Sequence, residues 1–134
     1  MRRAIFWLHR RLLLLEADAI SRRLGVSPSL TRAVIWQESK GVPVATPEAD
    51  GTTVYGVMQV KPGTARQMGW GGTDPRELLG VLGVWYGVKY LAWQGARYGG
   101  DVRQALSAYN AGTATARNAA YVDAVLAAQE RGRA

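Results

Sequence analysis

The chain has 134 residues, of which 48% are hydrophobic and 20% are charged, and this composition is typical of a folded domain rather than a disordered segment. A single domain of this length can bury a core without disulfides or metals. The chain contains no cysteine, which excludes disulfides and thiolate chemistry. Its formal net charge of +7 favours polyanionic partners, so nucleic acid, an anionic membrane surface and a bacterial cell wall all stay open.

The first segment, MRRAIFWLHRRLLLLEADAI, predicts a long amphipathic helix that ends at Gly25. We expect residues 1–18 to form a helical extension of the domain. Basic residues at 9–11 interrupt the apolar run, and no small-residue cleavage site follows it cleanly. The longest other apolar run, 78–88, is too short to cross a bilayer. We therefore expect neither a secretion signal nor an integral membrane span.

Helix signals continue along the chain. Ser27 and Pro28 are typical of an N-cap and a first helical residue, and they predict a helix that ends near Ser39. Residues 40–53 are rich in Gly, Pro, Thr and small side chains and predict a loop. Further helices are expected over 62–69 and from about Thr113. Asp74 is expected to cap a helix that runs to about Tyr98, with Glu77 at the capping-box position. Asp101 is expected to cap the helix that follows.

Strand signals are sparse. Only the segment TTVYGVMQV, residues 52–60, is β-branched and partly alternating. We find no internal repeat and no linker. The sequence thus predicts one mostly α domain with a small irregular or β-like segment around residues 52–60.

The expected helix over 28–39 carries one acid on an apolar face. Leu30, Val34 and Glu38 follow one another at intervals of four residues, so they share one side of a helix. A lone glutamate is usually exposed. Burial against Val34 and Ile35, together with the negative end of the helix dipole, would instead raise the pKa of Glu38, as a general acid near neutral pH requires. This pattern alone leaves both interpretations open.

Two further segments combine polar and aromatic side chains. In YGVMQV, Met58 and Gln59 place an adaptable apolar side chain next to an amide, although a short strand with a core methionine would look the same. In SAYNAG, Tyr109 and Asn110 precede the helix-ending Gly112. They could bond a carboxyl or a sugar hydroxyl, or the tyrosine could simply anchor the core.

The order of these motifs resembles the lytic transglycosylase family. WQESKG is followed by YGVMQVKPGTA, then by GVKYLAWQGARYGGDVRQALSAYNAG, and then by a YV at Tyr121 and Val122. That family carries an ES pair, a GLMQ-type segment, a YL-containing helix, AYNAG and a terminal YV. The resemblance covers roughly residues 19–125. It implies a single lysozyme-like catalytic domain over 1–134, with no cofactor and no metal, that cleaves the β-1,4 bond between N-acetylmuramic acid and N-acetylglucosamine in peptidoglycan glycan strands.

The resemblance also implies roles for individual residues. The family's single catalytic glutamate falls on Glu38, which would protonate the glycosidic oxygen and then deprotonate the muramoyl C6 hydroxyl as that hydroxyl closes on C1. The product would be a 1,6-anhydro sugar, and one acid would suffice where hydrolases usually need two carboxylates. The positions that match saccharide-binding motif residues are Ser39, Met58, Gln59, Tyr109, Asn110 and Tyr121.

The segment DGTTVYGVMQVK also resembles goose-type lysozymes, a related family. Those proteins place an aspartate five residues before the aromatic-Gly pair, where this chain has Asp50. They tend to place a second aspartate directly after MQV, where this chain has Lys61. Asp50 is therefore a candidate for positioning a water molecule, and hydrolysis of the same bond stays open as the alternative outcome.

A helix-turn-helix DNA-binding module is the competing interpretation. The segment AISRRLGVSPSLTRAVI has a glycine turn and flanking arginines in a basic chain. That interpretation places Glu38 against phosphates and leaves the downstream residues unexplained, so we expect no nucleic acid partner. An inactive wall-binding relative is disfavoured because Glu38 is present. We expect a monomer that acts on the bacterial cell wall, in the periplasm or outside the cell. Met1, the compact length and the lack of a recognisable secretion signal favour a phage lysin or a virion-associated protein.

Overall fold

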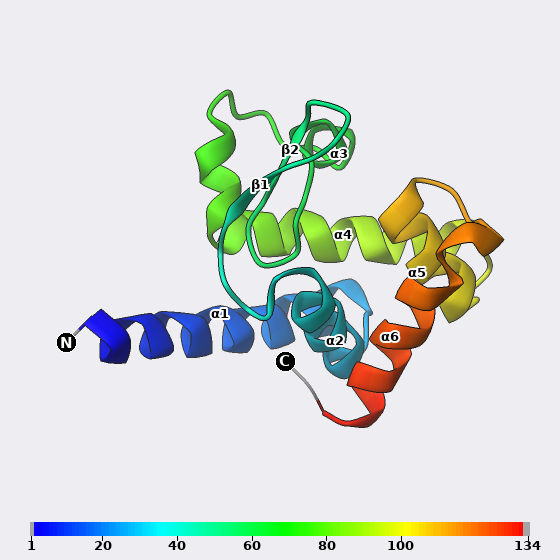
Figure 1. Ribbon diagram of the computed structural model, residues 1–134, viewed down its shortest axis with the longest axis horizontal. Coiled ribbons are helices and arrows are strands. Elements are labelled where there is room, and N and C mark those ends of the chain that lie inside the picture. Colours follow the sequence, from blue (N-terminus) through cyan, green and yellow to red (C-terminus); the bar gives the residue numbers. More distant parts are fainter. Residues whose placement is uncertain (1, 133–134) are drawn as a thin grey trace.

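The computed structural model describes residues 2–132, which form a mostly helical domain with one small hairpin (Figure 1). The α-helices are α1 (Arg2–Leu24), α2 (Pro28–Ser39), α3 (Pro62–Gln67), α4 (Val81–Arg97), α5 (Val102–Ala111) and α6 (Ala119–Glu130). Two short 3₁₀ helices are η1 (Pro75–Leu79) and η2 (Ala116–Asn118). The strands β1 (Ala45–Pro47) and β2 (Thr53–Tyr55) pair antiparallel, with Thr46 opposite Val54. The expected mostly α fold is confirmed.

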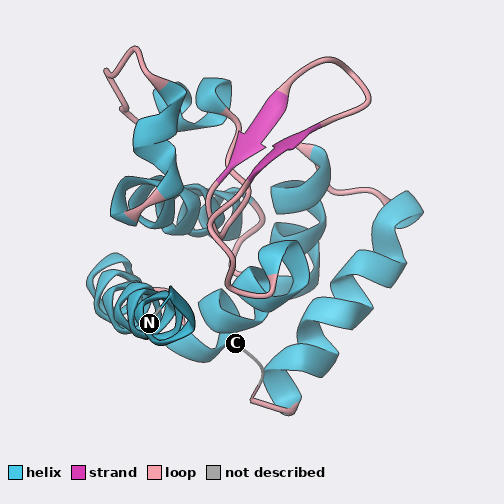
Figure 2. Ribbon diagram, turned by 60° about the vertical axis from the view of Figure 1, so that its left-hand side comes forward, coloured by secondary structure: helices cyan, strands magenta, loops and turns pink. Residues whose placement is uncertain are grey.

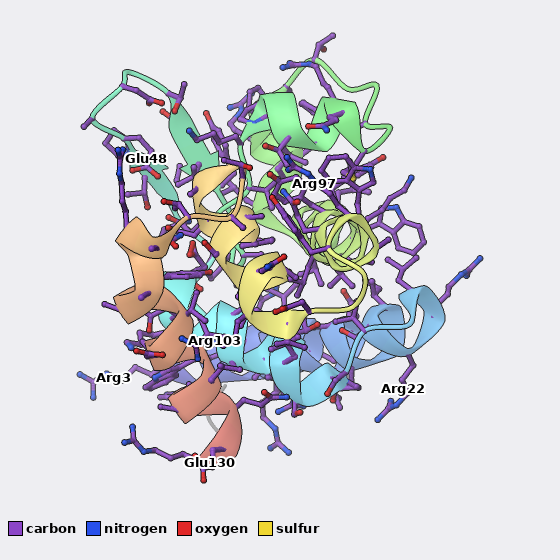
Figure 3. All side chains as sticks on the ribbon, turned by 90° about the vertical axis from the view of Figure 1, so that its right-hand side faces the viewer. Arg3, Arg22, Glu48, Arg97, Arg103 and Glu130 are labelled. Carbon is purple, nitrogen blue, oxygen red and sulfur yellow. The ribbon has the colours of Figure 1, made fainter. Side chains whose placement is uncertain are left out.

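Helix α2 lies at the centre of the packing. It contacts α1 on one side and α6 on another, while α4 packs on both α1 and α5. Five consecutive or nearly consecutive side chains of α2 are buried: Leu30, Thr31, Ala33, Val34 and Ile35. The hairpin lies on one side of these helices (Figure 2). Charged side chains such as Arg3, Arg22 and Glu130 point outward from the fold (Figure 3).

The burial of α2 overturns the helix-turn-helix interpretation. A recognition helix must expose one face to the major groove of DNA. Here Val34 and Ile35 are fully buried, and the helix is enclosed by α1 and α6. The turn at Gly25 that suggested the motif is only the end of α1, where the backbone takes a φ of 75°.

Local capping signals predicted several helix ends correctly. The Asp74 side chain accepts a hydrogen bond from the Arg76 backbone N–H, and the Asp101 side chain accepts one from the Gln104 N–H. Gly112 ends α5 with a φ of 87°. Ser27 occupies the N-cap position of α2, but its hydroxyl bonds to that of Ser29 and not to the backbone.

Other boundaries differ from the expected ones because tertiary contacts override local signals. The helix expected from Asp74 to Tyr98 is divided at Gly80 into η1 and α4. Glu77 does not complete a capping box with the helix start, because its carboxylate accepts a hydrogen bond from the Trp70 indole N–H at 3.3 Å. The last helix begins at Ala119 and not near Thr113.

The β segment also differs in extent. β1 lies within the range 40–53 that the sequence predicted as a loop. Of the expected strand over 52–60, only Thr53–Tyr55 is strand. The chain then makes a tight turn that is closed by mutual backbone hydrogen bonds between Tyr55 and Val60, at 3.0 and 2.9 Å.

The first helix has two different parts. Leu13, Leu14 and Ala17 are buried and belong to the core, so the domain packing begins inside the range expected to be an extension. The turns before them project beyond the rest of the fold and leave several apolar side chains exposed (Figure 1). Within residues 2–132, no helix is long and apolar enough to cross a membrane.

A close backbone approach holds the turn after β2 against the start of α4. A Cβ atom on Gly56 would lie 2.5 Å from the carbonyl oxygen of Leu78, and a Cβ atom on Gly83 would collide with the same oxygen. The Leu78 carbonyl is thus held between two positions that tolerate no side chain. The position of the Leu78 carbonyl therefore determines where the first turn of α4 packs against the turn that follows β2.

We expect Gly83→Ala to lower the free energy of unfolding by about 1–3 kcal/mol, because the new methyl group must displace backbone atoms. Gly95 lies on the same helix, and a Cβ atom there would meet no neighbouring atom within 4 Å, so it provides a matched control. Gly95→Ala should be neutral or stabilising by up to about 1 kcal/mol, from helix propensity alone. Urea unfolding followed by circular dichroism measures both, and equal stability of the two variants would contradict the close approach.

Candidate active site

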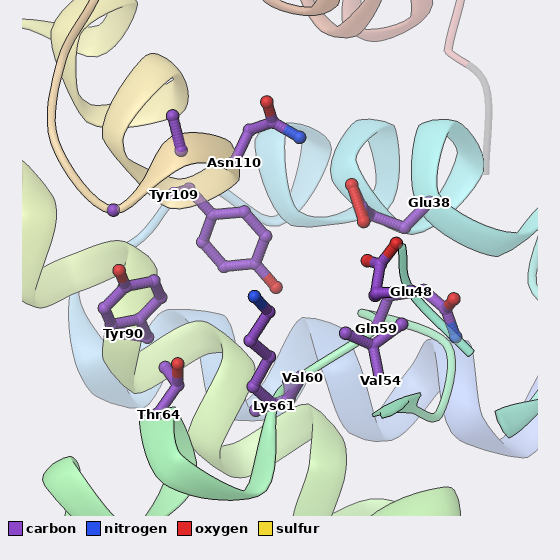
Figure 4. Close-up of a pocket in the computed structure, with 12 residues that line it drawn as sticks. Glu38, Glu48, Val54, Gln59, Val60, Lys61, Thr64, Tyr90, Tyr109 and Asn110 are labelled. Carbon is purple, nitrogen blue, oxygen red and sulfur yellow. The ribbon is translucent and has the colours of Figure 1, made fainter. Parts of the chain in front are cut away.

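A cavity of about 180 Å³ opens between the hairpin and the ends of α2 and α5 (Figure 4). Its walls come from four parts of the chain that are distant in sequence. The residues that line it are Glu38, Glu48, Val54, Gln59, Val60, Lys61, Thr64, Tyr90, Tyr109, Asn110, Ala111 and Gly112. The cavity therefore gathers three of the sequence motifs, WQESKG, YGVMQV and SAYNAG, around one space.

Glu38 stands in the last turn of α2, and its carboxyl reaches the cavity. Burial raises the pKa of this carboxyl from its ordinary value of 4.5 to about 7. The negative charge of Glu48 adds to the rise, and the Tyr121 hydroxyl opposes it. A substantial fraction of Glu38 is therefore protonated at neutral pH, as a general acid requires.

Two tyrosines enclose Glu38 from the side of α5 and α6. The Tyr109 hydroxyl donates a hydrogen bond of 2.8 Å to the Met58 carbonyl. The Tyr121 hydroxyl is buried and has no hydrogen-bond partner among the described residues, although it lies near enough to Glu38 to influence the pKa of that carboxyl. Burial, with Glu38 as the next cause, raises the pKa of both phenols, so both stay protonated. The Tyr121 O–H group is thus available to donate a hydrogen bond to the Glu38 carboxylate.

The turn after β2 presents Gln59 to the cavity. Gln59 has a positive φ of 52°, which is uncommon for a residue other than glycine. Its amide nitrogen donates to the Val44 carbonyl at 3.0 Å and to the Gly56 carbonyl at 2.9 Å, and these bonds hold the side chain in place. Both amide hydrogens point at the protein, so the side-chain oxygen is the group that can face a ligand.

Ser39 and Met58 lie behind the cavity wall and do not line it. The Ser39 hydroxyl donates to the Val57 carbonyl at 2.7 Å and accepts from the Gly41 N–H at 3.1 Å. The Met58 side chain is fully buried in the core. In this structure both residues join the end of α2 and the turn to the core, which positions Glu38 and Gln59. Direct contact of either side chain with a saccharide stays a prediction.

Asn110 lines the cavity at the end of α5 and is exposed. Its side-chain oxygen accepts a hydrogen bond of 2.9 Å from the Asn118 amide, which also donates to the Ser107 carbonyl. The Asn118 oxygen in turn accepts from the Ser107 hydroxyl at 2.6 Å. This network ties the segment before α6 to α5 and leaves the Asn110 amide N–H groups available to a ligand.

Asp50 does not line the cavity. It lies in the hairpin loop, where its carboxylate accepts hydrogen bonds from the Thr52 N–H at 3.0 Å and the Thr52 hydroxyl at 2.6 Å. Lys61 pairs with its second oxygen at 3.3 Å. Hydrogen bonds from Thr52, and the Lys61 ammonium, lower the pKa of Asp50 to about 2. Its role in positioning water stays a prediction, and in this structure its oxygens already have partners.

The sequence did not single out Glu48, which is the second carboxylate of the cavity. The Glu38 and Glu48 carboxyls point towards each other at the cavity wall (Figure 4), and the charge of Glu48 acts on the pKa of Glu38. Glu48 follows β1 directly, and its backbone N–H donates to the Thr52 carbonyl at 2.7 Å. Only the pairing of β1 with β2 brings it opposite α2, and no local pattern distinguishes it from Asp50.

Tyr90, Lys61 and Thr64 were also absent from the predicted binding residues. The Tyr90 ring packs on Tyr109 with a centroid separation of 5.5 Å, and its hydroxyl accepts a hydrogen bond from Gln94 at 2.9 Å. Lys61 brings a positive charge to the rim, and Thr64 brings a hydroxyl. The cavity therefore offers an acid with a raised pKa, a neighbouring carboxylate, amide groups and an aromatic wall, a set suited to a polar ring compound with hydroxyl and amide substituents.

Comparisons with known proteins identify the family and support the fold. The chain matches the sequence model of the family described as Transglycosylase SLT domain over residues 17–129. Its fold is similar to that in the X-ray structure of an inactive mutant of the lytic transglycosylase Slt from Pseudomonas aeruginosa, with a TM-score of 0.74 and 21% sequence identity. That similarity covers 95% of this chain and 24% of the other, so this chain spans about a quarter of the length of the structure that it matches. Because the family model covers most of the chain, the chain belongs to the family of SLT transglycosylase domains.

Proposed function

We propose that this domain is a peptidoglycan-cleaving lytic transglycosylase that acts on the β-1,4 bond between N-acetylmuramic acid and N-acetylglucosamine. The observation that carries the proposal is the buried Glu38 carboxyl, with a pKa of about 7, at a cavity built from the motifs of the family to which the chain belongs. The net charge of +7 suits an acidic wall polymer. We infer action at the bacterial cell wall, in the periplasm or outside the cell.

Glu38 serves as both acid and base in the proposed reaction. Its protonated carboxyl gives a proton to the glycosidic oxygen as the bond from that oxygen to C1 breaks. The resulting carboxylate then takes the proton of the muramoyl C6 hydroxyl as that oxygen bonds to C1. The 1,6-anhydro sugar forms, Glu38 is protonated again, and no water is consumed.

The neighbours of Glu38 fit this cycle. Burial holds the proton before the reaction, and the Tyr121 hydroxyl can donate a hydrogen bond to the carboxylate once the proton has left. Gln59 and Asn110 offer amide groups at the cavity wall for sugar hydroxyl or acetamido groups. The packed rings of Tyr90 and Tyr109 form the adjoining aromatic surface.

Glu48 favours a second candidate function, hydrolysis of the same bond. A carboxylate that faces the general acid across a cavity can hold a water molecule on the opposite side of the scissile bond. Glu48 lines the same cavity as Glu38, whereas Asp50 does not line it and is engaged by Thr52 and Lys61. The two functions differ in whether the C6 hydroxyl or water attacks C1.

Product analysis decides between the two candidate functions. We expect mass spectrometry of purified peptidoglycan digested by the domain to show muramoyl ends that are lighter by one water than reducing ends. Reducing muramoyl ends alone would identify a hydrolase and contradict the transglycosylase proposal. Intact glycan strands after digestion would contradict both.

Glu38→Gln should remove activity and yet stabilise the fold at alkaline pH. Loss of the acid should lower the cleavage rate by at least about 100-fold, the lower end of what general acid catalysis contributes. The folded-state pKa of Glu38, about 7, lies above the ordinary value of 4.5, so the buried carboxylate costs no stability below pH 4.5. The cost then grows as the pH rises to 7, towards at most about 3 kcal/mol.

Turbidity clearing of peptidoglycan and urea unfolding at pH 4 and pH 8 measure the two effects. Glutamine does not titrate, so its stability advantage over the parent chain should be present at pH 8 and absent at pH 4. Residual clearing at the parent rate would remove Glu38 from the catalytic role. An equal stability difference at both pH values would contradict the raised pKa.

Two neighbouring substitutions should move the pH dependence of cleavage in opposite directions. The rate should fall as the pH rises through the pKa of Glu38, because the acid must be protonated. Glu48→Gln removes a repelling charge and should move this fall to lower pH, whereas Tyr121→Phe removes a stabilising hydroxyl and should move it to higher pH.

Rates of clearing across the pH range measure these shifts. Glu130→Gln, on the outward-facing end of α6 (Figure 3), removes an equal charge far from the cavity and is the matched control that should leave the curve in place. Shifts in the same direction for Glu48→Gln and Tyr121→Phe would contradict the electrostatic assignment. If Glu48 positions water, Glu48→Gln should also lower the fraction of hydrolysed ends.

A further inference from the structure

The projecting part of α1 carries an apolar stripe that the fold does not cover. Ile5, Leu8, Leu12 and Leu15 follow one another at intervals of three, four and three residues, so they lie on one side of the helix. Their exposed fractions are 64%, 60%, 50% and 61%. We call these four residues the outer stripe.

The outer stripe and the core face of α1 are on opposite sides of the helix. The core face buries Leu13, Leu14 and Ala17, and the body of the domain packs against it through α2 and α4. The N-terminal turns extend beyond that body (Figure 1). A second helix can therefore approach the outer stripe without meeting the rest of the domain.

In place of the monomer expected from the sequence, we propose that the outer stripe is a homodimerisation surface, on which α1 of a second copy of this chain packs in parallel as a short two-stranded coiled coil. The spacing is that of the a and d positions of a heptad, with Ile5 and Leu12 at a and Leu8 and Leu15 at d. A β-branched residue at a with leucine at d favours two strands. This surface is independent of the cavity and of the proposed enzymatic activity.

Charges that flank the stripe fit the parallel arrangement. Arg11 lies at the g position beside the stripe, and Glu16 lies at the e position of the next heptad, five residues later. Both are exposed. In a parallel coiled coil a g residue meets the e residue of the following heptad on the partner helix, so Arg11 of each copy meets Glu16 of the other. An antiparallel pair that aligns the same stripe would instead separate Arg11 of each copy from Glu16 of the other.

The outer stripe has the residue spacing of a coiled-coil seam. Its four residues occupy a and d positions, and Phe6 and Trp7, at b and c positions of the same turns, add further exposed apolar surface, with exposed fractions of 40% and 56%. Because the stripe spans only two heptads, we expect weak association, with a dissociation constant in the micromolar range.

Sedimentation equilibrium of the full chain, from low to high micromolar concentration, tests the surface. The parent chain should form dimers, and Leu12→Glu should raise the dissociation constant at least tenfold with unchanged thermal unfolding. Val81 has a similar exposed fraction, 44%, at the start of α4, so Val81→Glu is the matched control that should still dimerise. A parent chain that stays monomeric throughout, or a Leu12→Glu variant that dimerises as the parent does, would overturn the proposal.

Charge reversal and crosslinking test the parallel register. Arg11→Glu alone and Glu16→Arg alone should each weaken the dimer, and the double variant should restore it. The chain has no cysteine, so Leu15→Cys introduces a single thiol that a parallel dimer brings next to its copy. In an antiparallel dimer the two thiols would be far apart, and a dimer without crosslinking would overturn the register.

Vesicles of phosphatidylglycerol and phosphatidylcholine provide the remaining test. The outer stripe should not drive binding to them, so the parent chain and Leu12→Glu should sediment equally with the vesicles. Binding by a monomeric parent chain that Leu12→Glu abolishes would overturn the proposal and assign the stripe to a lipid surface.

Discussion

The burial of one carboxyl at the end of α2 is the constraint around which the site is arranged. Glu38 lies in the last turn of a helix whose Val34 and Ile35 are fully buried, so its position cannot change without moving the core. Its ionised form is unfavourable there, both because the carboxyl is buried and because the negative charge of Glu48 is close. The fold therefore keeps a titratable group where ionisation costs stability, an arrangement that is typical of catalytic sites and rare elsewhere.

The turn after β2 connects the end of α2, where Glu38 lies, to the opposite wall of the cavity. Ser39, next to Glu38, bonds to the Val57 carbonyl, while Tyr109 bonds to the Met58 carbonyl. Two helices are thus fixed to successive residues of one turn. That turn is itself pressed against the Leu78 carbonyl through Gly56. Residues that do not line the cavity consequently determine the separation of those that do.

The sequence correctly predicted structural features that depend on hydrogen bonds between residues close together in the chain. The caps at Asp74 and Asp101 act within three residues, and the sequence placed both correctly. The hairpin depends on pairing across a loop, Ala45–Pro47 with Thr53–Tyr55, and three-residue strands leave no periodic pattern. The motif comparison placed Glu38, Gln59, Tyr109 and Asn110 at one site, and all four line the cavity. It could not find Glu48, because only the hairpin register brings that residue opposite α2.

Asp50 and Glu48, the two acids between β1 and β2, have opposite surroundings. This difference affects how readily Glu38 keeps its proton. Asp50 is matched by Lys61 and by both donors of Thr52, so its charge is neutralised within the loop. Glu48 faces Glu38 and disfavours a second negative charge beside it. A saccharide that fills the cavity would expel water and strengthen this repulsion, because the local dielectric falls. Substrate binding would then raise the pKa of Glu38 further, so the acid would be most fully protonated when the glycosidic oxygen is within its reach.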